Sequence, residues 1–211
     1  MNADLFSADD FTITPGAVVL RGFALPTEVQ LLQDVDAVMA AALPRHMTTP
    51  GGFKMSAAMT NCGAKGWITD RSGYRYAPRD PLTDLPWPPM PGSCADLARR
   101  AADRAGFAGF DPDSCLINRY EPGAKMSLHQ DRDERDFSGP IVSVSLGLQA
   151  IFLFGGLQRS DRPQRVALYH GDVVVWGGPA RLNFHGIAPI AEGNHPILGR
   201  QRINLTLRRS C

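Results

Sequence analysis

The stretch KMSLHQDRDE (residues 125–134) is a highly polar segment in an otherwise strand-rich part of the chain. It follows CLINRYEPG (115–123) and precedes PIVSVSLGLQAIFLFGG (140–156), whose apolar and β-branched residues predict buried strands. Only Met126 and Leu128 are apolar within it. A polar segment between two buried strands indicates side chains with a chemical role, because charged residues are seldom buried without a partner.

Short strands are predicted on both sides of this segment. After residue 114, several segments combine apolar runs or alternation with flanking turn residues. They are CLINRY, IVSVSLGL, AIFLFGG, RVALYHGDVVVWGG, RLNFHGIAPI and QRINLTLRR. Roughly six to eight such strands after a helical beginning predict a jelly-roll or cupin-like barrel, and therefore an α+β fold that is mainly β.

The N-terminal half is predicted to contain two helices. Residues 16–24 predict a strand, and residues 26–42 predict a helix opened by Pro26. A second amphipathic helix is predicted at residues 93–106 and ends at a glycine. The apolar positions that recur at helical spacing in the first helix are Val29, Leu32, Val35, Val38 and Met39.

Residues 44–91 differ in composition from the rest of the chain. They contain many prolines and glycines with aromatic and basic residues among them, which predicts short strands and long loops. We therefore expect one domain over residues 1–211. Within it, residues 44–91 form a flap and residues 115–209 form the jelly-roll catalytic core.

Charge and cysteine content limit the possible partners. Lysine and arginine total 22 against 21 acidic residues, so any anion-binding surface must be local. The four cysteines show no C-x-x-C pairing, which predicts reduced thiols in a cytosolic protein.

The N-terminus lacks the basic and apolar parts of a signal peptide, and no apolar stretch is long enough to cross a bilayer. We expect a soluble, cytoplasmic monomer without membrane contacts.

The polar stretch contains an H-x-D pattern that could bind a metal ion. Residues two apart on a strand point to the same face, roughly 6–7 Å apart, so His129 and Asp131 could contact one ion. A second histidine would complete a facial triad with three open coordination positions. His170, His185 and His195 are candidates, and His185 is the best placed because it lies between apolar residues on a predicted strand. The H-x-D pattern alone also fits a solvated turn.

The last predicted strand, RINLTLR, separates polar from apolar residues. One face has Arg202, Asn204, Thr206 and Arg208, and the other has Ile203, Leu205 and Leu207. The two arginines lie roughly 20 Å apart along a strand, and their long side chains could lean inward to hold both ends of a short dicarboxylate. Asn118 and Tyr120 could add neutral donors from a facing strand. The same alternation also fits an ordinary half-exposed strand.

A metal with three protein ligands beside a dicarboxylate clamp describes a 2-oxoglutarate-dependent, non-haem iron oxygenase. In such an enzyme Fe(II), 2-oxoglutarate and O2 supply the oxidising chemistry, and the protein positions them. The aromatic and basic flap favours a flat, polyanionic substrate. Two alternatives stay open: an oxygenase of the same chemistry that acts on a small molecule or a protein, and a metal-bearing cupin that binds ligands without catalysis.

The sequence resembles the bacterial AlkB family of DNA-repair dioxygenases over nearly the whole chain, from GAVVLRGF to RINLTLRR. The segments that carry the resemblance are TTPGG, MSAAMTNCG, GW, PWPPMP, CLINRYEPGAKMSLHQDRDE, PIVSVSLGLQAIFLFGGLQR, HGDVVVWGG and RLNFHGI. The resemblance implies a double-stranded β-helix core with two flanking helices, and a nucleotide-recognition lid at residues 44–91. It also implies oxidative demethylation of N1-methyladenine and N3-methylcytosine in single- or double-stranded DNA, with RNA as a further candidate. Formaldehyde, succinate and CO2 would be released.

The resemblance also implies roles for individual residues. The implied Fe(II) ligands are His129, Asp131 and His185. The implied 2-oxoglutarate-binding residues are Asn118, Tyr120, Arg202, Asn204 and Arg208, with Arg202 and Tyr120 toward the distal carboxylate. The implied substrate contacts are Met59, Trp67, Tyr74, Asp133, Glu134, Arg159 and Thr49 of the TTPGG loop. Two departures, Asn183 before Phe184 and the short tail after Arg208, bear only on substrate preference.

The methylated bases implied by the resemblance are cationic, which suggests how the flap recognises them. Trp67 is expected to stack on the extracted base. Asp133, expected on the same strand face as Asp131, would favour the cationic form. The basic residues expected near phosphates are Lys125, Arg132 and Arg159.

Overall fold

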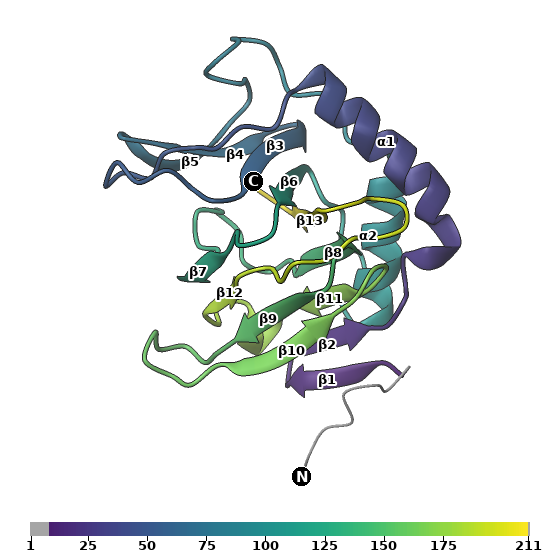
Figure 1. Cartoon of the computed structure of the whole chain (residues 1–211). Coiled ribbons are helices and arrows are strands. Elements are labelled where there is room, and N and C mark those ends of the chain that lie inside the picture. Colours follow the sequence, from purple (N-terminus) through teal and green to yellow (C-terminus); the bar gives the residue numbers. More distant parts are fainter. Residues whose placement is uncertain (1–8, 211) are drawn as a thin grey trace.

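The larger of two facing sheets has seven antiparallel strands in the order β1-β2-β11-β8-β13-β6-β3 (Figure 1). The computed structural model describes residues 9–210. The strands of this sheet are β1 (Phe11–Thr14), β2 (Ala17–Leu20), β11 (Val173–Trp176), β8 (Ile141–Gly147), β13 (Arg202–Arg208), β6 (Ser114–Tyr120) and β3 (Ala58–Gly63). In the β13–β6 register, Arg202 is opposite Tyr120 and Asn204 is opposite Asn118.

The smaller facing sheet has four antiparallel strands in the order β10-β9-β12-β7. Its strands are β10 (Gln164–Leu168), β9 (Ala150–Phe154), β12 (His185–Ile187) and β7 (Met126–His129). The β12–β7 register places His185 directly opposite His129. The two sheets form the predicted jelly-roll core, and pairing across the smaller sheet brings two distant histidines together.

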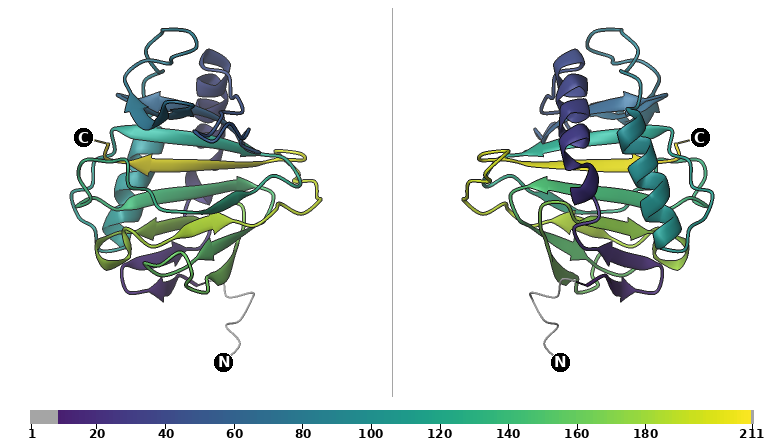
Figure 2. Two further views of the ribbon diagram at one scale, coloured as in Figure 1. Left: turned by 90° about the vertical axis from the view of Figure 1, so that its left-hand side faces the viewer. Right: turned by 90° about the vertical axis from the view of Figure 1, so that its right-hand side faces the viewer.

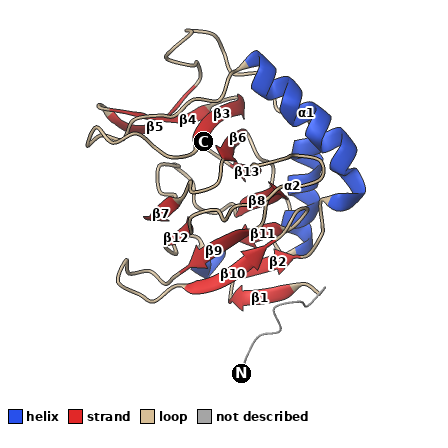
Figure 3. Cartoon of the chain, viewed as in Figure 1, coloured by secondary structure: helices blue, strands red, loops and turns tan. Residues whose placement is uncertain are grey.

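Two helices cover the outer face of the seven-stranded sheet (Figure 2, right; Figure 3). Helix α1 (Glu28–Ala41) follows the short 3-10 helix η1 (Leu25–Thr27), and α2 (Gly92–Arg104) precedes β6. A second 3-10 helix, η2 (Gly178–Ala180), leads from β11 toward β12. Both predicted helices are therefore confirmed. No helix within residues 9–210 is long and apolar enough to cross a membrane.

The alternation predicted for the last strand is present in β13. Ile203, Leu205 and Leu207 pack into the apolar core beneath the helices. The opposite face of the same strand presents its polar residues toward the smaller sheet, and Asn204 and Arg208 line a pocket there. The period of two thus separates a packing face from a polar face on one central strand.

The predicted flap contains a two-stranded hairpin, β4 (Gly66–Asp70) and β5 (Gly73–Ala77), joined to the core by long loops (Figure 1). A small apolar cluster holds it to the sheet, formed by Met47, Met59, Ile68, Trp87 and Leu116. The Trp87 indole lies so close to Gly66 that a Cβ there would come within 2.4 Å of Cε2. The glycine at the start of β4 therefore permits the close contact between the hairpin and the loop that follows it.

Three boundaries differ from the prediction. The strand predicted over residues 16–24 ends at Leu20, because the Asp172 carboxylate binds Arg21 and the backbone N–H of Gly22 and turns the chain. The sheet also extends beyond the expected 115–209 core, since β1, β2 and β3 belong to it. Strand β7 ends at His129, so the residues after it do not continue along the sheet.

The remaining differences are smaller. Val29 was expected on the apolar face of the first helix, but this residue is 70 % exposed in α1. Leu31, which was not among the expected positions, is buried. Cys62, Cys94 and Cys115 are buried free thiols, as predicted. Burial raises the pKa of Cys94 to about 12, so this thiol stays protonated at neutral pH. Cys211 lies outside the described residues.

Candidate metal centre and surrounding pocket

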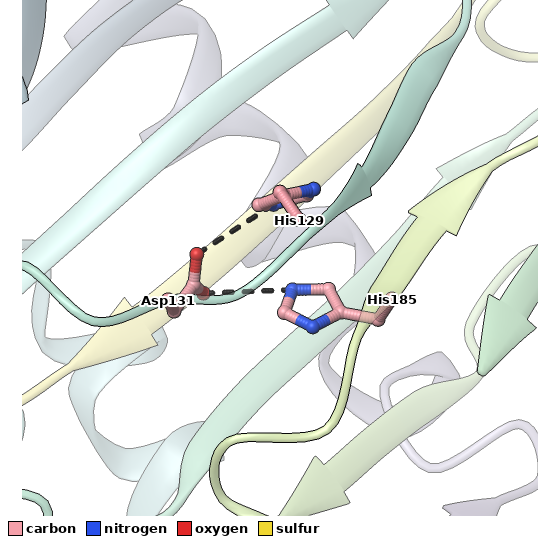
Figure 4. Close-up of side chains that lie close together, drawn as sticks. All are labelled: His129, Asp131 and His185. Atoms are coloured by element: carbon pink, nitrogen blue, oxygen red, sulfur yellow. Dashed lines mark ion pairs between the residues drawn. The ribbon is translucent and has the colours of Figure 1, made fainter. Parts of the chain in front are cut away.

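His129, Asp131 and His185 converge between the two sheets (Figure 4). His129 ends β7, His185 begins β12, and Asp131 follows β7 by two residues. Asp131 Oδ1 lies 3.6 Å from His129 Nε2, and Asp131 Oδ2 lies 3.7 Å from His185 Nε2. Among residues 9–210 this is the one group of three such side chains whose ligand atoms all lie within 4.8 Å of one another. One ion could therefore contact all three.

The hydrogen bonds of the two histidines favour metal binding. Nδ1 of His129 lies 2.9 Å from the carbonyl oxygen of Ser127, and Nδ1 of His185 lies 3.0 Å from that of Asn183. A carbonyl only accepts, so each Nδ1 carries a proton and donates it. Each Nε2 is then left with a lone pair that faces Asp131. This tautomer leaves Nε2 of each histidine able to bind a metal ion.

The charges at this site also suit a divalent cation. Burial, together with the neighbouring His129, lowers the pKa of His185 to about 3, although Asp131 opposes the shift. Burial by itself would raise the pKa of Asp131, but Arg208 and the two imidazoles hold it below its usual value. At neutral pH the group is thus a carboxylate with a neutral His185, which is what Fe(II) binding needs.

A buried network of charged groups fixes the position of Asp131. Arg208 donates to Asp131 Oδ2 from Nε at 2.9 Å and from Nη2 at 2.5 Å. Arg208 also lies 3.4 Å from Glu134, which forms a second ion pair with Arg181 at 3.2 Å. Arg181 donates in turn to the backbone carbonyl of Asp131 at 2.8 Å. Both the side chain and the backbone of Asp131 are therefore held before any ion binds.

The metal candidates form part of the wall of a pocket of about 630 Å³ that opens to solvent. Most predicted site residues line it, although they come from both sheets and from the flap. They are Thr49, Met59, Trp67, Tyr74, Asn118, Tyr120, Asp133, Arg159, Asn204 and Arg208. The predicted phosphate contacts Lys125 and Arg132 line it as well. Arg202 and Glu134 do not line the pocket, because both side chains are buried behind its wall.

Arg202 is fully buried and only partly hydrogen-bonded. Its Nη2 donates to Ser145 Oγ at 2.7 Å, and its guanidinium carbon lies 5.2 Å from the ring centroid of Tyr120. Within the described part of the chain, Nε and Nη1 have no hydrogen-bond partner. Leaving buried donors unpaired is costly, and a carboxylate would satisfy two such donors at once. The buried Oδ1 of Asn118 is likewise without a partner among these residues. The two unpaired Arg202 donors fit the carboxylate end of a 2-oxo acid, whereas the Asn118 oxygen is an acceptor and does not.

Two aromatic rings of the hairpin also line the pocket. The rings of Trp67 on β4 and Tyr74 on β5 stack with centroids 5.7 Å apart and an interplanar angle of 21°. The Trp67 indole Nε1 donates a hydrogen bond to Asp133 Oδ2 at 2.7 Å. Asp133 was expected on the strand face of Asp131, but it lies beyond the end of β7 and reaches the pocket through this contact with the flap.

The structure places Glu134 differently from the predicted substrate contact. It is buried, accepts a hydrogen bond from the Tyr76 hydroxyl at 2.7 Å, and pairs with Arg181 and Arg208. A carboxylate enclosed in this way supports the site from behind and does not face the pocket. Glu134 was predicted to contact substrate, and it lies in a run of charged residues in which nothing indicates that its side chain is buried.

The other histidine candidates lie away from the pocket. The rings of His170 and His195 are 4.4 Å apart, and His170 Nε2 lies 3.0 Å from Glu28. His170 Nδ1 accepts a hydrogen bond from the backbone N–H of Gly147. His185 is the histidine that meets the H-x-D pair.

Two residues of the network were missed by the sequence analysis. The alternation of β5 places Tyr76 on the same side as Tyr74, which was a usable signal. Burial raises the pKa of Tyr76, so its hydroxyl keeps the proton that it donates to Glu134. Arg181 follows a 3-10 turn, and nothing in its local sequence distinguishes it from a surface arginine.

Comparison with known proteins gives one consistent family. Residues 16–208 match the 2OG-Fe(II) oxygenase superfamily. The chain is 60% identical over 199 residues to the alpha-ketoglutarate-dependent dioxygenase AlkB of Salmonella typhimurium, covering 94% of this chain and 92% of that protein. It is 34% identical over 130 residues to the nucleic acid dioxygenase ALKBH1 of Mus musculus, covering 62% of this chain and 33% of that protein.

The fold has a similar counterpart among solved structures. The structure of OsALKBH1 superposes with a TM-score of 0.79 at 28% identity, covering 95% of this chain and 99% of that chain. The two-sheet core and the flanking helices are thus a fold that this chain shares with OsALKBH1 over nearly its whole length.

Proposed function

The chain belongs to the AlkB family of 2-oxoglutarate- and Fe(II)-dependent oxygenases, and we propose that it oxidatively removes methyl groups from alkylated bases in nucleic acids. N1-methyladenine and N3-methylcytosine in DNA are the proposed lesions, with RNA as a further substrate. When bound, Fe(II), 2-oxoglutarate and O2 supply the oxidising power that converts the methyl carbon to formaldehyde and leaves succinate and CO2. The role is direct reversal of alkylation damage.

One arrangement carries this proposal: a single pocket joins the metal-ligand group to a pair of stacked aromatic rings. His129, His185 and Asp131 form part of its wall, and the stacked Trp67 and Tyr74 line the same pocket. A base that stacks on an aromatic ring there would direct its substituents toward the metal ligands. An enzyme that must take a base out of its stack needs such a pocket.

The proposed role of the β13 face is to hold 2-oxoglutarate. Arg202 takes the distal carboxylate on its unpaired Nε and Nη1, with Tyr120 beside it, and Asn118 and Asn204 add polar contacts from neighbouring strands. Arg208 is assigned to the carboxylate next to the keto group, because it already binds the metal-ligand carboxylate Asp131. Guanidinium forks suit both tasks.

The proposed role of the flap is to recognise the base. Trp67 stacks on it, Asp133 favours its positive charge, and Met59, Tyr74, Thr49 and Arg159 complete the wall. Residues 44–91, apart from β3, which belongs to the large sheet, act as a nucleotide-recognition lid over the catalytic core, most of which lies in residues 115–209, and the hairpin β4–β5 contributes Trp67 and Tyr74 to the substrate contacts. Glu134 is removed from the proposed substrate contacts and acts by holding Arg181 and Arg208.

The test of substrate class is substrate-stimulated decarboxylation. The purified chain is mixed with Fe(II), 2-oxoglutarate and O2, and CO2 release is followed with no addition, with an unmodified oligonucleotide, or with one containing N1-methyladenine. The proposal predicts strong stimulation by the methylated oligonucleotide alone. Equal rates with both oligonucleotides would contradict a nucleobase demethylase and favour an oxygenase with a small-molecule or protein substrate.

A further inference from the structure

The segment from residue 130 to residue 140 joins β7 to β8 and belongs to neither a strand nor a helix. It contains the proposed metal ligand Asp131 and the proposed base contact Asp133. Phe137 is its one large apolar side chain and is 38 % exposed. A segment that buries so little apolar surface opens easily unless hydrogen bonds and ion pairs hold it.

Arg181 contacts this segment at four places along its length. Its Nη1 donates to the carbonyl oxygen of Asp131 at 2.8 Å, its Nη2 lies 3.2 Å from Glu134 Oε2, and its Nε donates to the carbonyl oxygen of Gly139 at 3.2 Å. The guanidinium carbon also lies 5.2 Å from the ring centroid of Phe137. Each guanidinium nitrogen thus contacts a different residue, and together they hold the segment from residue 131 to residue 139.

Arg181 itself lies on a fixed part of the chain. It is 3 % exposed, directly after η2. Three residues later, Phe184 donates its backbone N–H to the carbonyl oxygen of Gly156 at 2.9 Å and accepts from the N–H of Gly155 at 2.7 Å. His185 follows in β12. Arg181 therefore connects the segment that carries one proposed metal ligand to the segment that carries another.

The position of Arg181 separates it from the residues that contact ligands. Arg208 also contacts Asp131 and Glu134, but it lines the pocket and is proposed to bind 2-oxoglutarate. Arg181 does not line the pocket. Its contacts with the segment are therefore independent of the co-substrate, and it can act on the reaction only by positioning other residues.

We propose that Arg181 is a positioning residue that keeps Asp131 in place for Fe(II) while the chain is still metal-free. The proposal rests on the proposed function only in taking Asp131 and His185 as Fe(II) ligands. A ligand that is already in position needs no ordering when the ion binds, so the affinity is not reduced by that cost. Losing an outer partner of a metal ligand typically lowers metal affinity by roughly 10- to 100-fold.

The first test measures Fe(II) affinity in Arg181→Lys by anaerobic equilibrium dialysis. Lysine keeps the positive charge beside Glu134, but its single nitrogen cannot reach all the partners of a guanidinium. The matched control is Arg21→Lys. Arg21 also has a largely buried side chain, and it pairs with Asp172 and donates to the carbonyl oxygen of Ala167 without lining the pocket. Unfolding temperatures are recorded for both variants.

The two lysine variants should differ in metal binding and not in stability alone. Arg181→Lys should raise the Kd for Fe(II) about tenfold or more. Arg21→Lys should leave that Kd nearly unchanged, even where its unfolding temperature falls as far. An unchanged Kd in Arg181→Lys overturns the proposal. An equal rise in both variants also overturns it, because a general loss of stability would then explain the effect.

The second test follows the segment itself by limited trypsin digestion of the metal-free chain. Arg132 and Arg135 are exposed and lie within the segment, so its opening should make the bonds after them cleavable. A tenfold weaker Kd means that only about a tenth of the Arg181→Lys molecules hold the segment in place. Cleavage at these two bonds, identified by mass spectrometry, should then be about tenfold faster than in the wild type, and Fe(II) should slow it.

Equal cleavage rates at these two bonds in the wild type and Arg181→Lys overturn the proposal. Neither test uses an oligonucleotide. A chain that failed to demethylate any base would therefore still show whether Arg181 positions Asp131. A wild type that restores adenine, with an unchanged Fe(II) affinity in Arg181→Lys, would reject the role of Arg181 alone.

Discussion

The Trp67 indole Nε1 donates a hydrogen bond to Oδ2 of Asp133 at 2.7 Å, and so joins the flap to the segment that carries the proposed metal ligand Asp131. The ring proposed to stack on the base and the carboxylate proposed to sense its charge therefore form one unit. Their positions relative to the proposed metal ligands depend on each other.

Asp133→Asn should reduce activity selectively on cationic lesions. Asparagine keeps a side-chain oxygen that can accept from Trp67 but removes the negative charge. A charge-assisted contact contributes roughly 1.5–3 kcal/mol, so kcat/KM on N1-methyladenine and N3-methylcytosine should fall about ten- to a hundredfold. The neutral lesion N1-methylguanine should lose much less. Equal losses on both classes would leave Asp133 as a residue that only positions Trp67.

Arg202→Ala should weaken 2-oxoglutarate binding far more than oligonucleotide binding. Removing one partner of a buried charge pair commonly costs 2–5 kcal/mol, which corresponds to about thirtyfold to several thousandfold in Kd. Arg202→Lys keeps the positive charge but cannot donate two parallel hydrogen bonds to one carboxylate. Its Kd for 2-oxoglutarate should therefore lie between those of the wild type and Arg202→Ala. The Kd for 2-oxoglutarate is measured anaerobically by calorimetry on the Fe(II)-loaded chain. An unchanged Kd in Arg202→Ala would place the distal carboxylate elsewhere.

His185→Ala should abolish Fe(II) binding, and His170→Ala should not affect it. His185 Nε2 faces Asp131, whereas His170 Nε2 is bound to Glu28. Loss of a direct ligand should exceed the 10–100-fold that is typical for losing an outer partner of a metal site. Anaerobic equilibrium dialysis with Fe(II) gives the affinities without turnover. Fe(II) binding that survives in His185→Ala and is lost in His170→Ala would reverse the ligand assignment.

Tyr76→Phe should destabilise the fold, whereas Tyr74→Phe should not. Tyr76 donates to the buried Glu134, and its loss leaves a buried carboxylate oxygen without that donor, at a cost of about 1–3 kcal/mol. For a chain of this size each kcal/mol lowers the unfolding temperature by about 2–4 °C. Tyr74 is 49 % exposed, so removing its hydroxyl should change stability by less than about 0.5 kcal/mol. Calorimetric melting of both variants provides the comparison. Equal melting temperatures would mean that the Tyr76–Glu134 contact contributes nothing to stability.

Local periodicity was sufficient to predict the β13 face and the helices. The alternation of RINLTLR places Arg202, Asn204 and Arg208 on one face, and a period of two needs no knowledge of the rest of the fold. The H-x-D pair was also visible in the sequence, and His185 was the best placed of three candidate partners because it lies between apolar residues on a predicted strand. Only the pairing of β12 with β7 brings His185 opposite His129.

The positions of Asp133 and Glu134 could not be predicted in the same way. The chain leaves the sheet after His129 because Gln130 donates to the carbonyl of Leu182, and Arg181 donates to the carbonyl of Asp131. Glu134 is buried because Arg181 and Arg208 enclose it. These partners are distant in sequence, and a charged residue in a charged run carries no local mark of burial.

The most direct test of the central claim is the joint yield of formaldehyde and succinate. The chain is loaded anaerobically with Fe(II) and 2-oxoglutarate, and O2 is then added together with an oligonucleotide containing one N1-methyladenine. Demethylation predicts one formaldehyde and one succinate for each restored adenine, and neither product above background in His129→Ala. Succinate formed without formaldehyde, at a rate that the methylated base does not change, would contradict the assignment of this pocket to alkylated nucleobases.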